Sequence, residues 1–384
     1  MTERAWKGHA LWLVGFRPFF PLACAVAVVA PVLWVLMLAG VVSPPSGLQP
    51  QQWHAHEMFY GFGLAVLGGF LLTATKNWVQ VRGHHGRALQ VLVAAWLFER
   101  ATLWWGGAWP AWLRWVGLEA YGVLLVLLVS WTLVRGRKQD SYRDNFYFVV
   151  ALPVFLAARA LLLSASYFAQ GHAVTLALFR LAFVVMLERT LTQFMKAAFQ
   201  VALPRVAVLD GGIKVLALTL VAGPWLPGLV RPTVEVALAV LVTARFLSWS
   251  PHLAFQRIEL GVMYVGALAL ALQLVLDAFP LTWVGALPTH VFTFGTMGLI
   301  IPAMFTRIAH GHTGRPVRFE AVDRAVLWLM VLGFVARVVA PQVWPGAYRE
   351  LMWLAAGCWA LGFAVVGARI TPLVLAERVD GREH

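Results

Sequence analysis

The sequence predicts an all-α polytopic membrane protein, a bundle of about twelve transmembrane helices with both termini in the cytoplasm. Of its 384 residues, 61% are hydrophobic and only 12% are charged, whereas about a quarter of the residues of a typical soluble domain are charged. The mean hydropathy of +0.76 agrees with this class. Apolar runs of about 20 residues, the length that crosses a bilayer, follow one another along the chain. We therefore expect a single integral membrane domain, residues 1–384.

Breaks rich in proline, glycine or charged residues separate the apolar runs. The predicted spans cover residues 18–40, 54–75, 88–106, 110–134, 146–165, 172–195, 208–228, 232–250, 260–280, 287–308, 321–340 and 347–370. Arg17-Pro18 interrupts the first run, and no small-residue cleavage site follows it. The first span is therefore expected to remain uncleaved.

Basic residues fall in alternate connections. The connections at 76–87, 135–143 and 196–214 carry three or four lysines and arginines each, whereas 41–53, 166–172 and 279–286 carry none. Because positive charge marks cytoplasmic connections, this alternation places both termini in the cytoplasm. The net charge of +13 then reflects membrane topology, and we expect the lipid bilayer rather than nucleic acid as a partner.

Several site classes are not indicated. Cys24 and Cys358 lie in apolar segments without the spacing of a thiolate metal site or a disulfide framework. No glycine-rich phosphate loop and no hydrolytic constellation is evident.

Three histidines and a glutamate are expected at one depth near the outer face. His54, His56 and Glu57 open the second span, and His290 opens the tenth, which runs in the same direction. Titratable groups at membrane depth are costly and indicate function, and neutral imidazole is a common ligand of haem iron and copper. We predict the three histidines as leading ligands and Glu57 as the catalytic candidate, which orients a ligand or accepts a proton. For each histidine alone, an ordinary hydrogen-bonded interfacial residue is the alternative.

The spacing of His54 and His56 leaves two arrangements open. Residues two apart lie about 200° apart on a helix but on the same side of an extended strand. The two imidazoles therefore share one ligand only if the segment is extended, and otherwise serve two sites. His54 and Glu57, three apart, share a helical face.

Arginines lie at the same predicted depth. Arg100, Arg159 and Arg337 fall within the outer ends of spans three, five and eleven. Guanidinium groups bind carboxylates such as haem propionates, so we predict a cofactor-binding role, with snorkelling to the membrane surface as the alternative.

Two further groups of polar residues stay open to two interpretations. Inside the sixth span, Arg180 and Glu188-Arg189 form either an internal ion pair or a proton or anion path. At the inner end of the tenth span, His310 and His312 belong either to a glycine-rich helix stop or to a second metal-ligand cluster. His84 and His85 would complete that cluster.

Four segments together resemble the NnrS family: Gly15-Phe16-Arg17-Pro18-Phe19-Phe20, the hexapeptide from Trp53 to Met58, Gly69 to Ala74 with Asn77-Trp78, and the run from His290 to Pro316. They occur in family order and at family spacing. The resemblance implies a twelve-helix protein of the bacterial inner membrane that carries haem and copper. It also implies an association with denitrification genes and a role in the response to nitric oxide and nitrosative stress.

The chain departs from the family pattern in two places. Where the family has a Gly-Arg-x-Ile-Pro turn in the sixth span, this chain has Glu188-Arg189-Thr190-Leu191-Thr192. Glu259 stands near the ninth span where a histidine is common. A family site in spans six to nine is therefore in question for this chain.

Three function classes follow. The first is a haem and copper protein that binds or handles nitric oxide or its iron-nitrosyl products. The second is a proton-coupled transporter, in which histidines and Glu188-Arg189 bind protons and substrate at broken helices. The third is a haem-based sensor or metal-handling factor without turnover.

Overall fold

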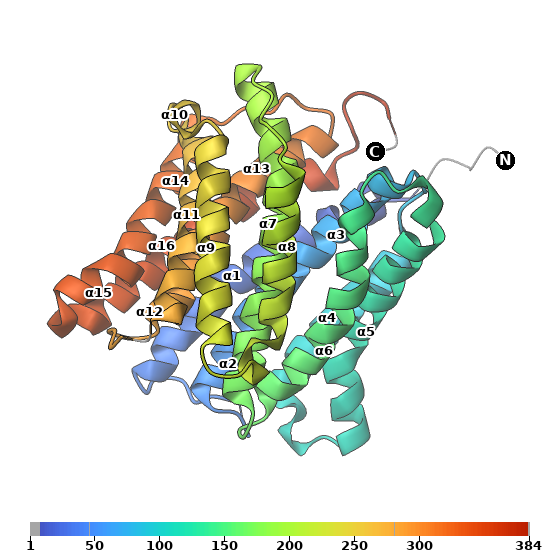
Figure 1. Cartoon of the computed structure of the whole chain (residues 1–384). Helices are drawn as coiled ribbons and strands as arrows, with labels where there is room; N and C mark the ends of the chain where they lie inside the picture. The colour runs from blue at the N-terminus through green and yellow to red at the C-terminus, as the bar shows by residue number, and fades with distance from the viewer. Residues whose placement is uncertain (1–7, 46, 280, 383–384) are drawn as a thin grey trace. The chain divides into compact units, whose positions relative to one another are not determined.

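The computed structural model describes residues 8–45, 47–279 and 281–382. All regular secondary structure in these residues is helical (Figure 1). This confirms the all-α prediction.

Nine helical stretches of the described chain are long and apolar enough to cross a membrane. They are Phe16–Leu38 (α1), Pro50–Val79 (α2 and α3), Ala111–Arg135 (α5), Phe146–Leu163 (α6), Ala207–Trp225 (containing α8, Ala207–Thr219), Ile258–Ala278 (α11), Leu287–His312 (α12 and α13), Ala321–Val343 (α14 and α15) and Pro345–Leu375 (containing α16, Tyr348–Leu375).

Three more long helices fall at the third, sixth and eighth predicted spans. They are Arg87–Trp105 (α4), Phe168–Phe199 (α7) and Val230–Ser248 (α9). Each contains three or four charged residues, which lower its mean hydropathy. The structure thus supports a multi-pass membrane protein, while the count of twelve spans and the orientation of the termini stay predictions.

The chain forms two compact units. Unit 1 comprises Met1–Gly171, Phe305–Arg318 and Phe363–His384, and unit 2 comprises His172–Met304 and Phe319–Gly362. The chain passes from one unit to the other within α7, within α13 (Leu299–His312), between Arg318 and Phe319, and within α16.

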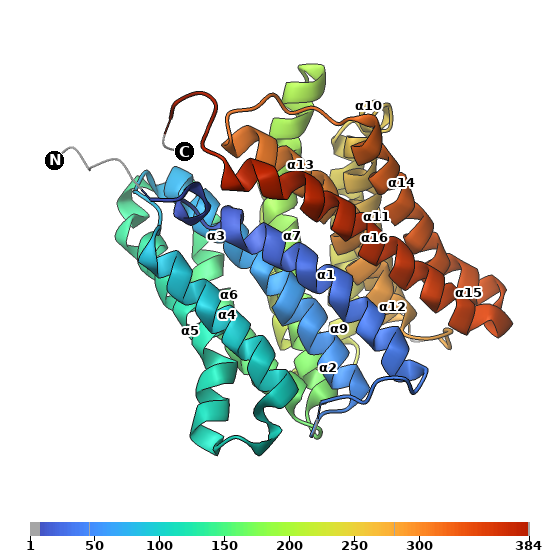
Figure 2. The ribbon, with the colours of Figure 1, turned by 180° about the vertical axis from the view of Figure 1, so that it is seen from behind.

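In unit 1, α1 packs closely against α3 (Leu64–Val79), and the two helices run side by side in Figure 2. A Cβ atom added to Gly69 would lie 2.8 Å from Cβ of Phe19 and 3.4 Å from the carbonyl oxygen of Gly15. The backbone nitrogen of Phe16 donates to Oγ1 of Thr73 at 2.9 Å. Gly69 therefore serves a close helix contact, as small residues commonly do at helix interfaces in membranes.

In unit 2, α11 packs against α9 and against the helical stretch that contains α12 and α13. A Cβ atom added to Gly266 of α11 would lie 2.6 Å from Ile300, and Oγ1 of Thr296 donates to the carbonyl oxygen of Gly266 at 2.8 Å. This contact also depends on a glycine at the interface.

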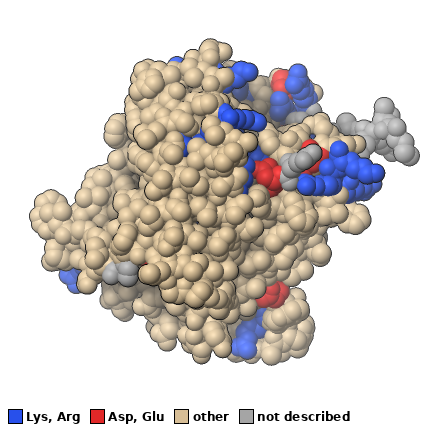
Figure 3. All heavy atoms as spheres, viewed as in Figure 1, with Lys and Arg blue, Asp and Glu red and all other residues tan. Residues whose placement is uncertain are grey.

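The surface carries many large apolar side chains. Trp105, Trp112 and Trp115 have exposed fractions of 66–68%, and the face seen in Figure 3 is largely free of charged side chains. Such a surface suits contact with lipid, because lipid-facing positions need no polar partner.

In the described part of the chain, three π-helical segments interrupt the α-helices. They are Glu57–Gly63, Val291–Gly298 and Val335–Val339. The first follows His54 and His56 directly, the second follows His290, and the third contains Arg337. π-Helical turns are rare and occur frequently at functional sites.

Candidate functional site

The segment that carries His54 and His56 is helical, which decides between the two arrangements left open by the sequence. α2 (Pro50–His56) begins with a proline at its start and a capping box between Gln49 and Gln52. The ring of His54 stacks on Trp34 of α1, with centroids 4.5 Å apart. His56 is fully buried elsewhere in unit 1. The two imidazoles therefore have separate surroundings.

His56 lies between two carboxylates. Its Nδ1 atom is 3.3 Å from Oε1 of Glu57, and its Nε2 atom is 3.4 Å from Oε1 of Glu99. Both ring nitrogens thus face acidic partners, and a metal ion bound to His56 would have to replace one of them. Glu99 did not stand out in the sequence argument, although an acidic residue next to Arg100 inside an apolar span was a signal.

The two arginines predicted in unit 1 join the same cluster. Arg100 places Nε 3.1 Å from Oε1 of Glu57 and Nη2 3.2 Å from Oε2 of Glu99. Arg159 places Nη1 2.9 Å from Oε1 of Glu99 and also pairs with Glu119. Protein carboxylates are therefore the partners of both guanidinium groups here, and a role for them with cofactor carboxylates stays a prediction.

The π-helical segment provides the space for this cluster. A Cβ atom at Gly61 would lie 2.8 Å from Oε2 of Glu57, so glycine is what admits the carboxylate. The carbonyl oxygen of Gly61 accepts from the indole nitrogen of Trp96 at 3.2 Å. The Arg100 guanidinium lies 5.1 Å from the centre of the Trp96 ring, within cation–π range. Glu57 is thus fixed by its own helix and by α4.

In unit 2 the structure brings His290 and Arg337 together. Nδ1 of His290 is 2.8 Å from the carbonyl oxygen of Ala286, and Nε2 is 3.3 Å from Nη2 of Arg337. Because arginine only donates, Nε2 accepts and Nδ1 carries the proton. Nη1 of Arg337 also donates to the Tyr348 hydroxyl at 3.3 Å. An imidazole whose Nδ1 donates to a backbone carbonyl has the orientation common among metal-bound histidines.

The family model described as NnrS protein matches residues 10–378. The chain belongs to the NnrS family. The match covers nearly the whole chain and confirms the resemblance that the sequence motifs indicated. Members of this family are membrane proteins of the nitric oxide response. No curated protein and no solved structure matches the chain.

The histidines predicted to bind metal in this NnrS-family chain are distributed over both units. His54, His56, His310 and His312 belong to unit 1, and His290 belongs to unit 2. Nδ1 of His310 is 2.8 Å from the carbonyl oxygen of Thr306, and the His312 ring lies 5.4 Å from that of Phe16. A site shared by the second and tenth spans stays a prediction.

His84 and His85 have their own partners in the connection between α3 and α4. Nε2 of His84 lies 3.0 Å from both the carbonyl oxygen of Leu128 and Oγ1 of Thr132. Nδ1 of His85 lies 2.9 Å from the carbonyl oxygen of Gly83. Burial lowers the pKa of His84, while its hydrogen bond to Leu128 acts in the opposite direction. Both histidines thus have hydrogen-bond partners within the protein, and their part in a second ligand cluster stays a prediction.

Within the described residues, no three histidine, cysteine, aspartate or glutamate side chains are grouped closely enough to hold a metal ion. A copper site in this chain stays a prediction. Haem would need fewer protein ligands, because a single imidazole can hold its iron. His290 and His310, each held through Nδ1 by the carbonyl four residues earlier, fit that requirement.

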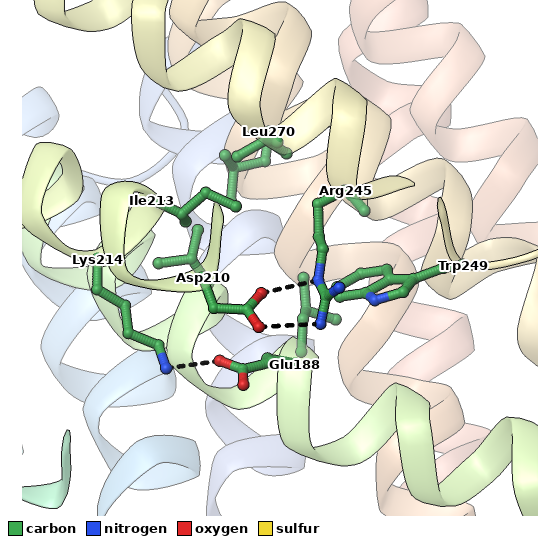
Figure 4. A pocket seen from close by; sticks show the side chains of 11 residues that line it. Glu188, Asp210, Ile213, Lys214, Arg245, Trp249 and Leu270 are labelled. Carbon is green, nitrogen blue, oxygen red and sulfur yellow. Dashed lines mark hydrogen bonds and ion pairs between the residues drawn. The ribbon is translucent and has the colours of Figure 1, made fainter. Parts of the chain in front are cut away.

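A second charged cluster lines a pocket of unit 2, where the chain departs from the NnrS pattern (Figure 4). Glu188 of α7 pairs with Lys214 of α8, with Oε2 and Nζ 2.6 Å apart. Asp210 of α8 pairs with Arg245 of α9, with Oδ1 and Nε 2.9 Å apart. Glu188 thus finds its partner on the next helix, as neighbours in a helix face different directions. Asp210, Lys214 and Arg245 were not among the site residues predicted from the sequence.

Arg180, the other arginine noted in the sixth span, also has an acidic partner. Its Nη1 atom lies 3.6 Å from Oδ2 of Asp277 and donates to the side-chain oxygen of Gln273 at 3.2 Å. Arg180 thus forms an internal ion pair with Asp277, and a proton or anion path through it stays a prediction.

Proposed function

We propose that this chain is a haem- and copper-carrying protein of the bacterial inner membrane. In this proposal it binds or handles nitric oxide or its iron-nitrosyl products in nitrosative stress defence and denitrification. The family match supports the nitric oxide response as the setting. Haem iron supplies the bond to nitric oxide, and the protein supplies the ligands and the polar surroundings.

The observation that carries the proposal is the position of the π-helical segments. One follows His54 and His56, one follows His290, and one contains Arg337. Three segments of an uncommon conformation thus coincide with residues singled out by their chemistry. A chain that only needed to cross the membrane would gain nothing from widened turns at these places.

Among the candidate ligands, His290 is oriented by a hydrogen bond of its own helix. Its Nδ1–H group is bound to the carbonyl oxygen of Ala286, so its basic nitrogen is Nε2. Arg337 donates to that nitrogen now and would turn to a haem carboxylate when the imidazole is ligated. In unit 1, His54 and His56 are the further leading ligands, and His310 and His312 are candidates at the other end of their unit.

Glu57 fits a role in holding or moving a proton. Its Oε1 atom faces both Nε of Arg100 and Nδ1 of His56, and it is almost completely buried. A carboxylate held between a permanent cation and an imidazole is oriented for proton transfer to that imidazole.

The test is an absorption spectrum and metal analysis of the protein purified in detergent. We expect a Soret band, copper, and a spectral change on addition of nitric oxide. A colourless protein free of both metals would contradict the proposal and favour the proton-coupled transporter. Haem binding without steady-state nitric oxide consumption would instead favour a sensor or a metal-handling factor.

A further inference from the structure

The pocket between α7, α8, α9 and α11 has no part in the function proposed above. It is lined by the two ion pairs, by Trp249 and by apolar side chains such as Ile213 and Leu270. We propose that this pocket binds a small monovalent oxyanion together with one proton, with the anion on Arg245 and the proton on Asp210. The proposal depends on neither haem nor copper.

Arg245 is already paired with a carboxylate, with a hydrogen bond from Nη2 and with Nε in ion-pair contact. Its Nε and Nη2 atoms lie 2.9 and 3.3 Å from Oδ1 and Oδ2 of Asp210, while Nη1 donates to the carbonyl oxygen of Pro204 at 2.8 Å. Two parallel N–H groups on one edge of a guanidinium form the fork that recognises carboxylates and similar anions. Asp210 occupies the place that a bound anion would take.

Charge balance explains why the anion should arrive with a proton. The cluster contains two cations, Lys214 and Arg245, and two carboxylates, Glu188 and Asp210, so it is neutral. The side chains of Arg245 and Asp210 are only 3% and 10% exposed. An added anion alone would leave a net negative charge in mostly apolar surroundings, which is unfavourable. An anion and a proton together leave the cluster neutral.

Of the two carboxylates in the cluster, Asp210 is a better acceptor for this proton than Glu188. The charged groups acting on it are Arg245 from α9, Glu188 from α7 and Lys214 from its own helix, while α11 contributes the apolar Ala267 and Leu270 to the pocket. Glu188 repels the Asp210 carboxylate and is itself held by Lys214 at 2.6 Å. When Asp210 takes a proton from water, an O–H bond forms and its side chain loses the charge that pairs with Arg245. The N–H groups of Arg245 are then available to the incoming anion.

Trp249 supplies an additional donor. It is 5% exposed, and its indole N–H has no hydrogen-bond acceptor among the residues described by the structure. Its ring lies 5.1 Å from the guanidinium carbon of Arg245, so donor and fork line the same pocket (Figure 4). A buried donor without an acceptor is costly, and a bound oxyanion would satisfy it.

The size of the pocket limits the ligand. Its volume of about 30 Å³ corresponds to about two water molecules. Nitrite and formate, which are small and planar and carry one negative charge, suit this space. Haem propionates and phospholipid headgroups do not, because each is attached to a much larger molecule.

The experiment measures nitrite and formate binding to the detergent-purified full chain by calorimetry across about two pH units around neutrality. If one proton is taken up with each anion, the affinity should rise by up to about tenfold for each unit of falling pH. Asp210→Asn, which resembles the protonated side chain, should bind the anions without this pH dependence. Trp249→Phe should lower the affinity by about tenfold, because it loses a hydrogen bond to a charged group.

Two controls separate this site from others. Trp225→Phe changes a 62% exposed tryptophan of unit 2 and should have no effect. His290→Ala should not alter the binding, whereas it would remove anions bound to haem at that histidine. Undetectable binding, pH-independent binding to the unaltered protein, or an unchanged affinity in Trp249→Phe would each overturn the proposal. Trp249→Phe removes no charge, so it decides the question even if Asp210→Asn fails to fold.

Discussion

Arg337, in one π-helical segment of unit 2, donates a hydrogen bond to His290, which directly precedes another, with Nη2 of Arg337 3.3 Å from Nε2 of His290. The sequence indicated both residues as cofactor-binding, but it did not pair them with each other. Because of this bond, the basic nitrogen of His290, Nε2, faces Arg337. An external ligand of that nitrogen therefore requires Arg337 to move, which couples the two residues in any binding event.

Replacement of Arg337 should separate this role from simple structural support. Arg337→Gln removes the charge, and we expect lower haem content in membranes while the protein still accumulates. Arg337→Lys retains the charge but loses the planar fork, so it should restore haem content only partly. The measurement is the haem-to-protein ratio of purified variants. A normal ratio in Arg337→Gln would assign the residue to structure alone.

Arg159 should behave differently, because its partners are protein carboxylates. Arg159→Gln leaves Glu99 and Glu119 without this cation, and Glu99 is only 1% exposed. Removal of one partner from a buried ion pair costs about 3–5 kcal/mol, so thermal unfolding in detergent should begin at a clearly lower temperature. Arg114→Gln, at an exposed position, is the matched control and should have little effect. Loss of haem from a variant of unchanged stability would instead favour the propionate role.

The helices could be predicted from the sequence because hydropathy and helix breaks are local properties. The partners of the charged residues could not. Glu99 and Arg159 lie 60 residues apart, and Asp210 and Arg245 lie 35 apart, so their pairing depends on which helices pack together. The π-helical segments were also missed, because the extra residue in a turn leaves no compositional signal. His54 and His56 could be predicted in part: the sequence limited them to two arrangements, and the helical conformation of α2 decided between them.

Gly61 tests the space that the first π-helical segment provides. A methyl group at this position would lie 2.8 Å from Oε2 of Glu57 and 3.2 Å from Val26. We expect Gly61→Ala to displace the Glu57 carboxylate and to lower stability by about 1–3 kcal/mol, as overpacking does. Gly211→Ala is the control, because a Cβ atom there meets nothing within 4 Å and alanine favours helix. Equal unfolding temperatures for the two variants would contradict this account.

The C-terminal segment should be sensitive to acid. Hydrogen bonding to Arg378 lowers the pKa of Asp380 from 3.8 to about 2. Since the folded-state value lies below the ordinary one, the stabilisation is complete above pH 3.8 and is lost as the pH falls through about 2. The protection of the Val379 N–H, which donates to Thr313 at 3.1 Å, should therefore fall in that range when its exchange is compared with the intrinsic rate at the same pH. In Asp380→Asn this protection should be lower above pH 3.8 as well, and unchanged protection there would refute the link.

The ligand prediction concerns the histidines. A metal-bound imidazole contributes a bond that alanine cannot replace, whereas loss of an ordinary hydrogen-bonding histidine costs only about 1–3 kcal/mol of stability. We therefore expect His54→Ala, His56→Ala and His290→Ala each to lose haem or copper while the protein remains folded.

The controls for this prediction are His84→Ala and His85→Ala. His84 is bound to Leu128 and Thr132, and His85 to Gly83, so their loss should reduce stability slightly and leave the metals in place. Glu57→Gln should retain metal and change the spectrum or the reaction with nitric oxide, because it alters a group beside a ligand rather than a ligand. If His290→Ala keeps the original spectrum and copper content, the ligand must be sought at the other end of the tenth span. His310 is then the better candidate, because its Nδ1 is held by Thr306 just as that of His290 is held by Ala286.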